Sequence, residues 1–118
     1  MEQYIAWFAT LRMNDVPRVG GKNASLGEMI SQLAHLGVRV PDGFATTASA
    51  YRDFLAQGGL DQRIRSVLDN LNVADVTALA TAGSQIRQWI VDTPLPQRLE
   101  SEVRQAYAKM QLDAGGEI

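Results

Sequence analysis

Apolar residues recur with a helical period along most of the chain. From Ser25 onward they fall three or four positions apart on a single stripe, which comprises Leu26, Met29, Ile30, Leu33 and Leu36. This spacing predicts an amphipathic helix. Ser25 and Glu28 have the spacing of a capping box, and Gly37 supplies a stop signal. We therefore predict a helix that begins at Ser25 and ends before Gly37.

Four further helices are expected in the second half of the chain. The first follows Thr46-Thr47 and stops at Gly58-Gly59, and Asp75 is placed to cap the third. Gly83 falls on the apolar stripe of that third helix, where a missing side chain would let a neighbouring backbone approach closely. The first of these helices is expected to turn inward Tyr51, Phe54 and Leu55, and the second Leu60, Ile64, Val67, Leu68 and Leu71. The third is expected to turn inward Val76, Leu79, Ile86 and Ile90, and the fourth Leu99, Val103, Ala106, Tyr107 and Met110.

The N-terminal part has a different pattern. Residues 4–11 mix aromatic, β-branched and small residues and stop at the turn signal of residues 14–17, which predicts a short strand. Residues 38–44 are expected to be extended and to return to that strand. The fold class is therefore helix-rich α+β, with about five helices and two or three short strands near the N-terminus. So small a sheet has exposed edges and would be more stable with further strands.

Composition narrows the classes of function. The 118 residues suit one domain or part of one, and 46% hydrophobic residues suffice for a core. The absence of cysteine excludes disulfide and thiolate chemistry, and a formal charge of −2 gives no reason to expect nucleic acid or an anionic membrane as a partner. The apolar run at residues 4–11 is too short to span a bilayer. It follows Glu2 instead of the basic segment that a secretion signal requires, so we expect a cytoplasmic protein that does not associate with a membrane.

The segment from Val19 to Ser25 carries the candidate chemistry. Gly20 and Gly21 expose backbone N–H groups just before a helix N-terminus, where the helix dipole favours an anion. Lys22, one of only two lysines, could reach a phosphate there. The segment is not a Walker A loop, because Val16 occupies the place of the first glycine. On these residues alone a polyphosphate site and an ordinary turn both stay open.

Other candidates are weaker. His35 lies on the polar side of the predicted helix and is expected to be a solvated surface residue. Asp15, Arg18 and Arg39 lie near the glycine turn in sequence and could contact a nucleotide, but turn capping and surface solvation are the favoured explanation. The acidic residues show no metal-ligand spacing.

Four blocks of the sequence carry a resemblance: residues 14–16, 19–29, 40–47 and 85–94. Together they resemble the opening of the phosphoenolpyruvate synthase (pyruvate, water dikinase) family. The resemblance implies that residues 1–112 are the first subdomain of an ATP-grasp-like nucleotide-binding domain, and residues 113–118 a flexible truncated end. It further implies that Lys22 contacts the ATP phosphates and that Gly20 and Gly21 shape its turn.

The same resemblance implies the chemistry of a longer parent enzyme. That enzyme would convert ATP, pyruvate and water to AMP, phosphoenolpyruvate and phosphate through a phosphohistidine, with Mg²⁺ held by residues outside this chain. Pyruvate would bind to domains that the chain lacks, and a homodimeric parent is left open. His35 does not match the surroundings of the carrier histidine, so no catalytic residue is expected in this fragment, which should be inactive alone.

Two alternatives remain at this stage. Pyruvate, phosphate dikinase and rifampin phosphotransferase share the Gly-Gly-Lys turn, but a glycine commonly follows their lysine, whereas Asn23-Ala24-Ser25 follows it here. If the chain belonged to one of these two enzymes, it would be the nucleotide-binding part of a related phosphotransferase. The other alternative is a helical interaction module without catalytic function.

Overall fold

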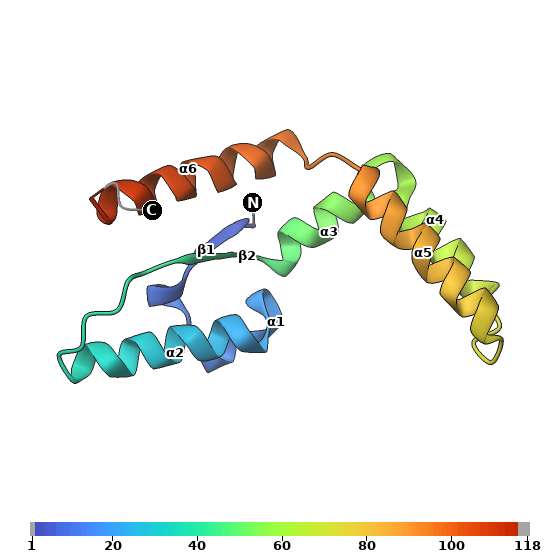
Figure 1. Ribbon diagram of the computed structural model, residues 1–118. Coiled ribbons are helices and arrows are strands. Elements are labelled where there is room, and N and C mark those ends of the chain that lie inside the picture. The colour runs from blue at the N-terminus through green and yellow to red at the C-terminus, as the bar shows by residue number, and fades with distance from the viewer. Residues whose placement is uncertain (1, 116–118) are drawn as a thin grey trace. The chain divides into compact units, whose positions relative to one another are not determined.

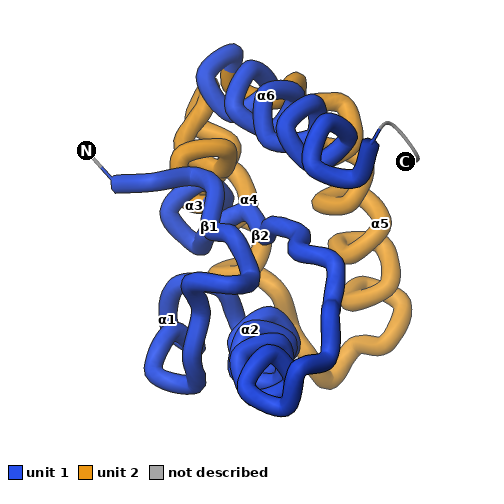
Figure 2. Tube along the Cα trace, turned by 90° about the vertical axis from the view of Figure 1, so that its left-hand side faces the viewer, with its two compact units in different colours: residues 1–51, 97–118 blue, residues 52–96 orange. Residues whose placement is uncertain are grey.

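The computed structural model describes residues 2–115 and confirms a helix-rich α+β chain. It contains two compact units (Figure 2). The first combines the residues up to Tyr51 with those from Gln97 onward, and the second is Arg52–Pro96. The strands and helices, labelled as in Figure 1, are β1 Ile5–Trp7, α1 Val16–Val19, α2 Gly21–His35, β2 Phe44–Thr46, α3 Ala48–Ala56, α4 Leu60–Asp69, α5 Val76–Asp92 and α6 Gln97–Asp113.

The sheet of the first unit is an antiparallel pair of three-residue strands. Ala6 of β1 lies opposite Ala45 of β2, so the chain returns to the first strand as expected, but the strand begins only at Phe44, the last residue of the predicted extended segment. The predicted strand over residues 4–11 was too long, because Phe8–Thr10 forms a 3-10 turn. The Thr10 hydroxyl donates to the Trp7 carbonyl at 2.7 Å, a local bond that competes with strand pairing.

Two apolar clusters hold the first unit together. One joins α2 to the sheet and consists of the buried residues Ala6, Leu11, Val19, Ala24 and Ala45, with Phe8 packed against them. The other joins α3 and α6 to the N-terminal segment and consists of Tyr4, Ala50 and Leu99, with Val103 packed against them. The first unit is thus a three-layer arrangement in which α2 and α6 flank a very small sheet (Figure 1).

Arg98 attaches the start of α6 to the N-terminal segment. Its guanidinium carbon lies 3.7 Å from the centre of the Tyr4 ring, and Nη2 donates to the Glu2 carbonyl at 2.7 Å. Nε donates to the Glu102 carboxylate one turn further along α6 at 2.8 Å. A single side chain therefore joins two segments that lie 96 positions apart in the sequence.

The helix predicted to begin at Ser25 begins four residues earlier, at Gly21, and ends at His35. The predicted capping box is wrong, since Ser25 and Glu28 lie inside the helix and no side chain caps Gly20. The predicted stop is confirmed, because Gly37 has φ of 78°. The helix starts earlier because Gly20 alone supplies the non-helical backbone that a start requires.

The buried face of α2 is also different from the predicted stripe. It consists of the small residues Ala24 and Gly27, whereas Leu26 and Met29 are 38% and 46% exposed. A Cβ atom on Gly27 would lie 2.6 Å from the Leu11 carbonyl oxygen, so the loop backbone occupies the space of a side chain. The close approach of the loop leaves room only for small residues on this face of α2, and Leu26 and Met29 lie outside it.

The second unit is built on α4 and α5. Asp75 caps α5 as predicted, with its carboxylate accepting from the Ala78 N–H at 3.1 Å. Arg63 of α4 stacks over the Trp89 ring of α5, 4.9 Å from its centre. The expectation for Gly83 is wrong: a Cβ there would meet the Arg87 side chain of the same helix at 3.1 Å, and not a neighbouring backbone.

Several other positions that periodicity placed inward are exposed. Leu60 and Phe54 are buried as expected, and so are Leu99 and Ala106. The exposed positions are Leu36, Tyr51, Leu68, Val76, Leu79 and Tyr107. Of the predicted flexible end, Asp113 is the last residue of α6, and residues 116–118 lie outside the described residues.

Candidate functional site

The glycine turn lies between the short helix α1 and the N-terminus of α2. Gly20 has φ of 86° and ψ of 165°, a conformation that side-chain-bearing residues rarely adopt. Its N–H donates to the Val16 carbonyl at 2.8 Å, and its carbonyl accepts from the Ala24 N–H at 3.1 Å. Only Gly20 of the predicted pair has a positive φ, since Gly21 is already the first residue of α2.

The first turn of α2 has the properties of an anion site. Its leading N–H groups have no acceptor within the helix, and no side chain caps them. Gly21 and Lys22 are exposed, so both the amides and the ammonium group are accessible. The Asn23 side chain does not occupy these N–H groups, because its amide donates to the Val19 carbonyl at 2.8 Å. The helix dipole and the lysine charge act in the same direction here.

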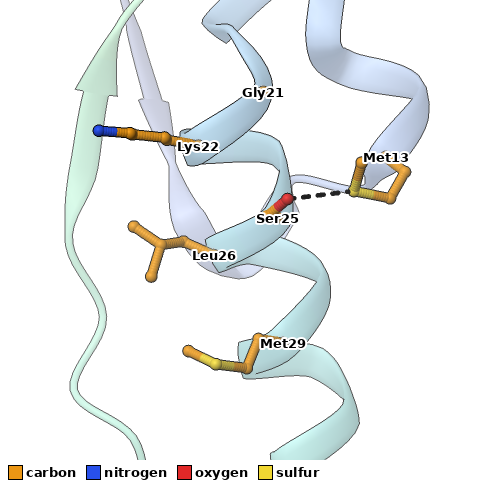
Figure 3. A pocket seen from close by; sticks show the side chains of 6 residues that line it. All are labelled: Met13, Gly21, Lys22, Ser25, Leu26 and Met29. Carbon is orange, nitrogen blue, oxygen red and sulfur yellow. Dashed lines mark hydrogen bonds between the residues drawn. The ribbon is translucent and has the colours of Figure 1, made fainter.

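An open hollow of about 500 Å³ adjoins this turn. It is lined by Met13, Gly21, Lys22, Ser25, Leu26 and Met29. Figure 3 shows Lys22, Leu26 and Met29 extending from α2 toward the same side. The Ser25 hydroxyl donates to the Met13 sulfur at 3.7 Å, which attaches the loop before α1 to α2. The wall is therefore apolar over most of its length and cationic at the end nearest the helix N-terminus.

A charged network surrounds the start of α1. The Asp15 carboxylate accepts from the Arg12 backbone N–H at 2.9 Å and from the Arg18 guanidinium at 3.1 Å. These two hydrogen bonds, the backbone one foremost, lower the pKa of Asp15 from its ordinary value of 3.8. Arg12 donates to the carbonyls of Ala9 and Leu11. Asp15 and Arg12 thereby hold the loop that packs against α2, so their contacts indicate a structural role.

The lowered pKa of Asp15 predicts a pH effect on stability. A carboxylate with a depressed folded-state pKa stabilises the fold above the unfolded pKa, and this contribution is lost as the pH falls through the folded value. We expect Asp15→Asn to destabilise the chain at neutral pH, with the difference from wild type shrinking at pH values below 3.8. Denaturant unfolding of both proteins over that pH range measures the difference in stability. Arg18→Gln removes the guanidinium donor to Asp15 and should reduce the pH dependence of stability partially. A difference between wild type and Asp15→Asn that is independent of pH would contradict the assignment.

The other sequence candidates do not converge on the turn. His35 is exposed at the last position of α2, and Arg39 follows that same end. A helix of 15 residues is roughly 22 Å long, so both lie far from Gly20. Among residues 2–115 no cluster of three or more acidic, histidine or cysteine side chains could hold a metal ion. No helix in that part of the chain is long and apolar enough to cross a membrane.

Sequence reasoning missed the residues that line the hollow beside Lys22. The helical spacing of Leu26 and Met29 predicts core positions for both, and no sequence pattern distinguishes Met13. The signal that could have identified them is the pair of small residues Ala24 and Gly27 on the opposite face of the same helix. Two small residues one turn apart indicate a close contact on their own side of the helix.

Residues 16–117 match the family described as pyruvate phosphate dikinase, AMP/ATP-binding domain. This match covers most of the chain and includes the Gly20–Lys22 turn and α2. The chain therefore belongs to this family of nucleotide-binding domains.

The curated relatives make the assignment more specific. The chain is 62% identical over 115 residues to the phosphoenolpyruvate synthase of Neisseria meningitidis serogroup B, and the match covers 98% of this chain and 14% of that protein. It is 58% identical over 109 residues to the phosphoenolpyruvate synthase of Escherichia coli K12, covering 92% and 14%. With the enzyme of the same name from Pseudomonas aeruginosa the identity is 59% over 110 residues. The chain thus spans about one seventh of the length of these relatives.

Proposed function

We propose that this chain is the N-terminal part of a phosphoenolpyruvate synthase and contributes the first residues of its ATP-binding site. The parent enzyme converts ATP, pyruvate and water to AMP, phosphoenolpyruvate and phosphate through a phosphohistidine. Lys22 binds the ATP phosphates, and Gly20 and Gly21 shape the turn that presents it. The Mg²⁺ ligands, the carrier histidine and the pyruvate site belong to other parts of the parent, which acts in the cytoplasm.

The observation that supports this proposal most strongly is the uncapped first turn of α2. Its free N–H groups, its exposed lysine and the adjacent open hollow are the features that a polyphosphate requires. Lys22 neutralises negative charge, and the amides orient the phosphate oxygens. In phosphoryl transfer most of the rate arises from such positioning and charge neutralisation.

The chain alone cannot complete this chemistry in our proposal. A polyphosphate carries several negative charges, and the described part of the turn offers one lysine and a few amides for them. The hollow is open, so bound phosphates would stay in contact with water, which weakens each charge interaction. We therefore assign the remaining ATP contacts to the parent and expect the chain alone to be inactive.

A related phosphotransferase is the second candidate, because the matching family takes its description from pyruvate phosphate dikinase. The relatives named above favour the synthase, since each of them is a phosphoenolpyruvate synthase and its match covers nearly the whole of this chain. The nucleotide half of the reaction would be shared in both cases. Only the acceptor of the phosphoryl group would differ.

Product analysis of the parent enzyme tests the proposal. With ATP, Mg²⁺ and pyruvate in water we expect AMP, phosphoenolpyruvate and phosphate in equal amounts, and no product from the 118-residue chain in the same assay. Replacing pyruvate by rifampin provides the matched comparison for the acceptor. Phosphorylation of rifampin with pyruvate left unchanged would overturn the synthase assignment, and product formation by the isolated chain would overturn its expected inactivity.

A further inference from the structure

The turn that precedes Lys22 has almost no packing of its own. Cβ atoms placed on Gly20 and Gly21 would meet no atom of another segment within 4 Å, so contacts do not restrain this backbone. Glycine loses more conformational freedom on folding than any other residue. The turn therefore depends on hydrogen bonds and on the buried residues at its two ends, Val19 and Ala24.

Hydrogen bonds hold the peptide group between Val19 and Gly20 on both sides. Its N–H, which belongs to Gly20, donates to the Val16 carbonyl at 2.8 Å. Its C=O, which belongs to Val19, accepts from the side-chain amide of Asn23 at 2.8 Å. The Gly20 carbonyl on the next peptide group accepts from the Ala24 N–H at 3.1 Å. Of these bonds, the one from Asn23 is made by a side chain, so a substitution can remove it.

The Asn23 amide also changes the electrostatics of the turn. Val19 is the last residue of α1, where helix carbonyls have no N–H partner inside the helix. Such a carbonyl carries partial negative charge and would repel a phosphate at the first N–H groups of α2. The Asn23 side chain supplies the missing donor. One hydrogen bond therefore both orders the turn and satisfies an acceptor that disfavours an anion.

We propose that Asn23 is a positioning residue for the ATP phosphates, which acts through the Val19–Gly20 peptide group on the first N–H groups of α2 and on Lys22. This inference rests on the proposed function, because it takes ATP as the ligand of the turn. Lys22 extends from the first turn of α2, so the same backbone sets its starting point (Figure 3). An ordered turn binds phosphates without first losing conformational freedom, which is the cost that preorganisation avoids.

Two variants of the parent enzyme test this proposal. Asn23→Ala removes the donor to Val19, whereas the hydroxyl of Asn23→Ser can still donate, because serine inside a helix bonds to the carbonyl four residues earlier. In calorimetric titration with ATP and Mg²⁺, Asn23→Ala is expected to bind ATP about 3- to 10-fold more weakly, the usual effect of one neutral hydrogen bond. Asn23→Ser should retain most of the affinity. Unchanged affinity in Asn23→Ala, or equal losses in both variants, would overturn the proposal.

A double-mutant cycle with Lys22 separates positioning from a general effect on the fold. Because part of the effect of Asn23 acts through the lysine, Asn23→Ala is expected to reduce ATP affinity less in the Lys22→Ala enzyme than in wild type. The KM for pyruvate, which our proposal places in another part of the parent, should stay unchanged. Additive losses in the cycle, or a matching rise in the KM for pyruvate, would indicate a merely structural role and overturn the positioning role.

Failure of the proposed function gives a distinct result. Unchanged ATP affinity in the Lys22→Ala enzyme would overturn the proposed function, whichever result the Asn23 variants give. Weaker ATP binding in Lys22→Ala together with unchanged binding in Asn23→Ala would overturn the role of Asn23 alone.

Discussion

Lys22→Ala in the parent enzyme is expected to weaken ATP binding by about 10- to 100-fold. A hydrogen bond to a charged group contributes roughly 1.5–3 kcal/mol, and each 1.4 kcal/mol corresponds to about tenfold in affinity. Lys22 lies in the first turn of α2, where its charge adds to the field of the helix dipole. Calorimetric titration with ATP and Mg²⁺ measures the change, and Lys22→Arg should retain part of the affinity because it retains the charge.

The chain offers a matched control for this experiment. Lys109, the second lysine of the sequence, pairs with Asp113 at 2.7 Å and lies 4.8 Å from the centre of the Trp7 ring. It is on α6, which contributes no residue to the hollow beside Lys22. Lys109→Ala removes the same charge from the protein and should leave ATP affinity unchanged. Equal losses for both variants would show a general effect of charge and would contradict a specific role for Lys22.

Gly27→Ala is expected to destabilise the first unit by about 1–3 kcal/mol, the usual cost of overpacking a filled interior. The added methyl group would lie 2.5 Å from the Leu11 Cβ and 2.8 Å from the Phe8 carbonyl oxygen. These neighbours include backbone, so relief requires movement of the loop or of α2. Urea unfolding, monitored with a probe in the first unit, measures the change.

Gly21→Ala is the matched control in the same helix. A Cβ atom at Gly21 would meet no atom within 4 Å, and the residue already belongs to α2. Alanine is favoured over glycine inside a helix by roughly 0.5–1 kcal/mol, so this variant should be as stable as wild type or more stable. If Gly27→Ala were also neutral, the close packing of α2 against the loop at residues 8–11 would be refuted.

The sequence predicts the local features well where a single residue type carries the signal. Asp75 caps α5, Gly37 follows the end of α2, and the glycines at 58 and 59 both have positive φ after α3. The motif Gly20-Gly21-Lys22 is also distinct in the sequence alone, and its role in ATP binding remains a prediction. These features depend on backbone geometry and charge, which few neighbours can alter.

Other features could not be deduced from the sequence, because they depend on how closely segments approach. Periodicity places Leu26 and Met29 in the core, yet α2 buries Ala24 and Gly27. A hydrophobic period counts apolar residues without regard to size, whereas a close contact selects small ones. The predicted helix start at Ser25 is wrong for a related reason. A serine in the second turn of a helix has the same sequence signal as a capping serine, and only the backbone conformation distinguishes the two.

By itself, then, the sequence determined that this chain is a helix-rich α+β unit with a lysine beside a glycine turn, because capping residues, glycines and charge act over a few neighbouring positions. Only the tertiary structure decided which face of α2 is buried, which apolar residues line the hollow beside Lys22, and in which register the two strands pair. Those properties arise from contacts between segments far apart in sequence, such as Leu11 against Gly27 and β1 against β2. No local pattern encodes the separation of two segments in space.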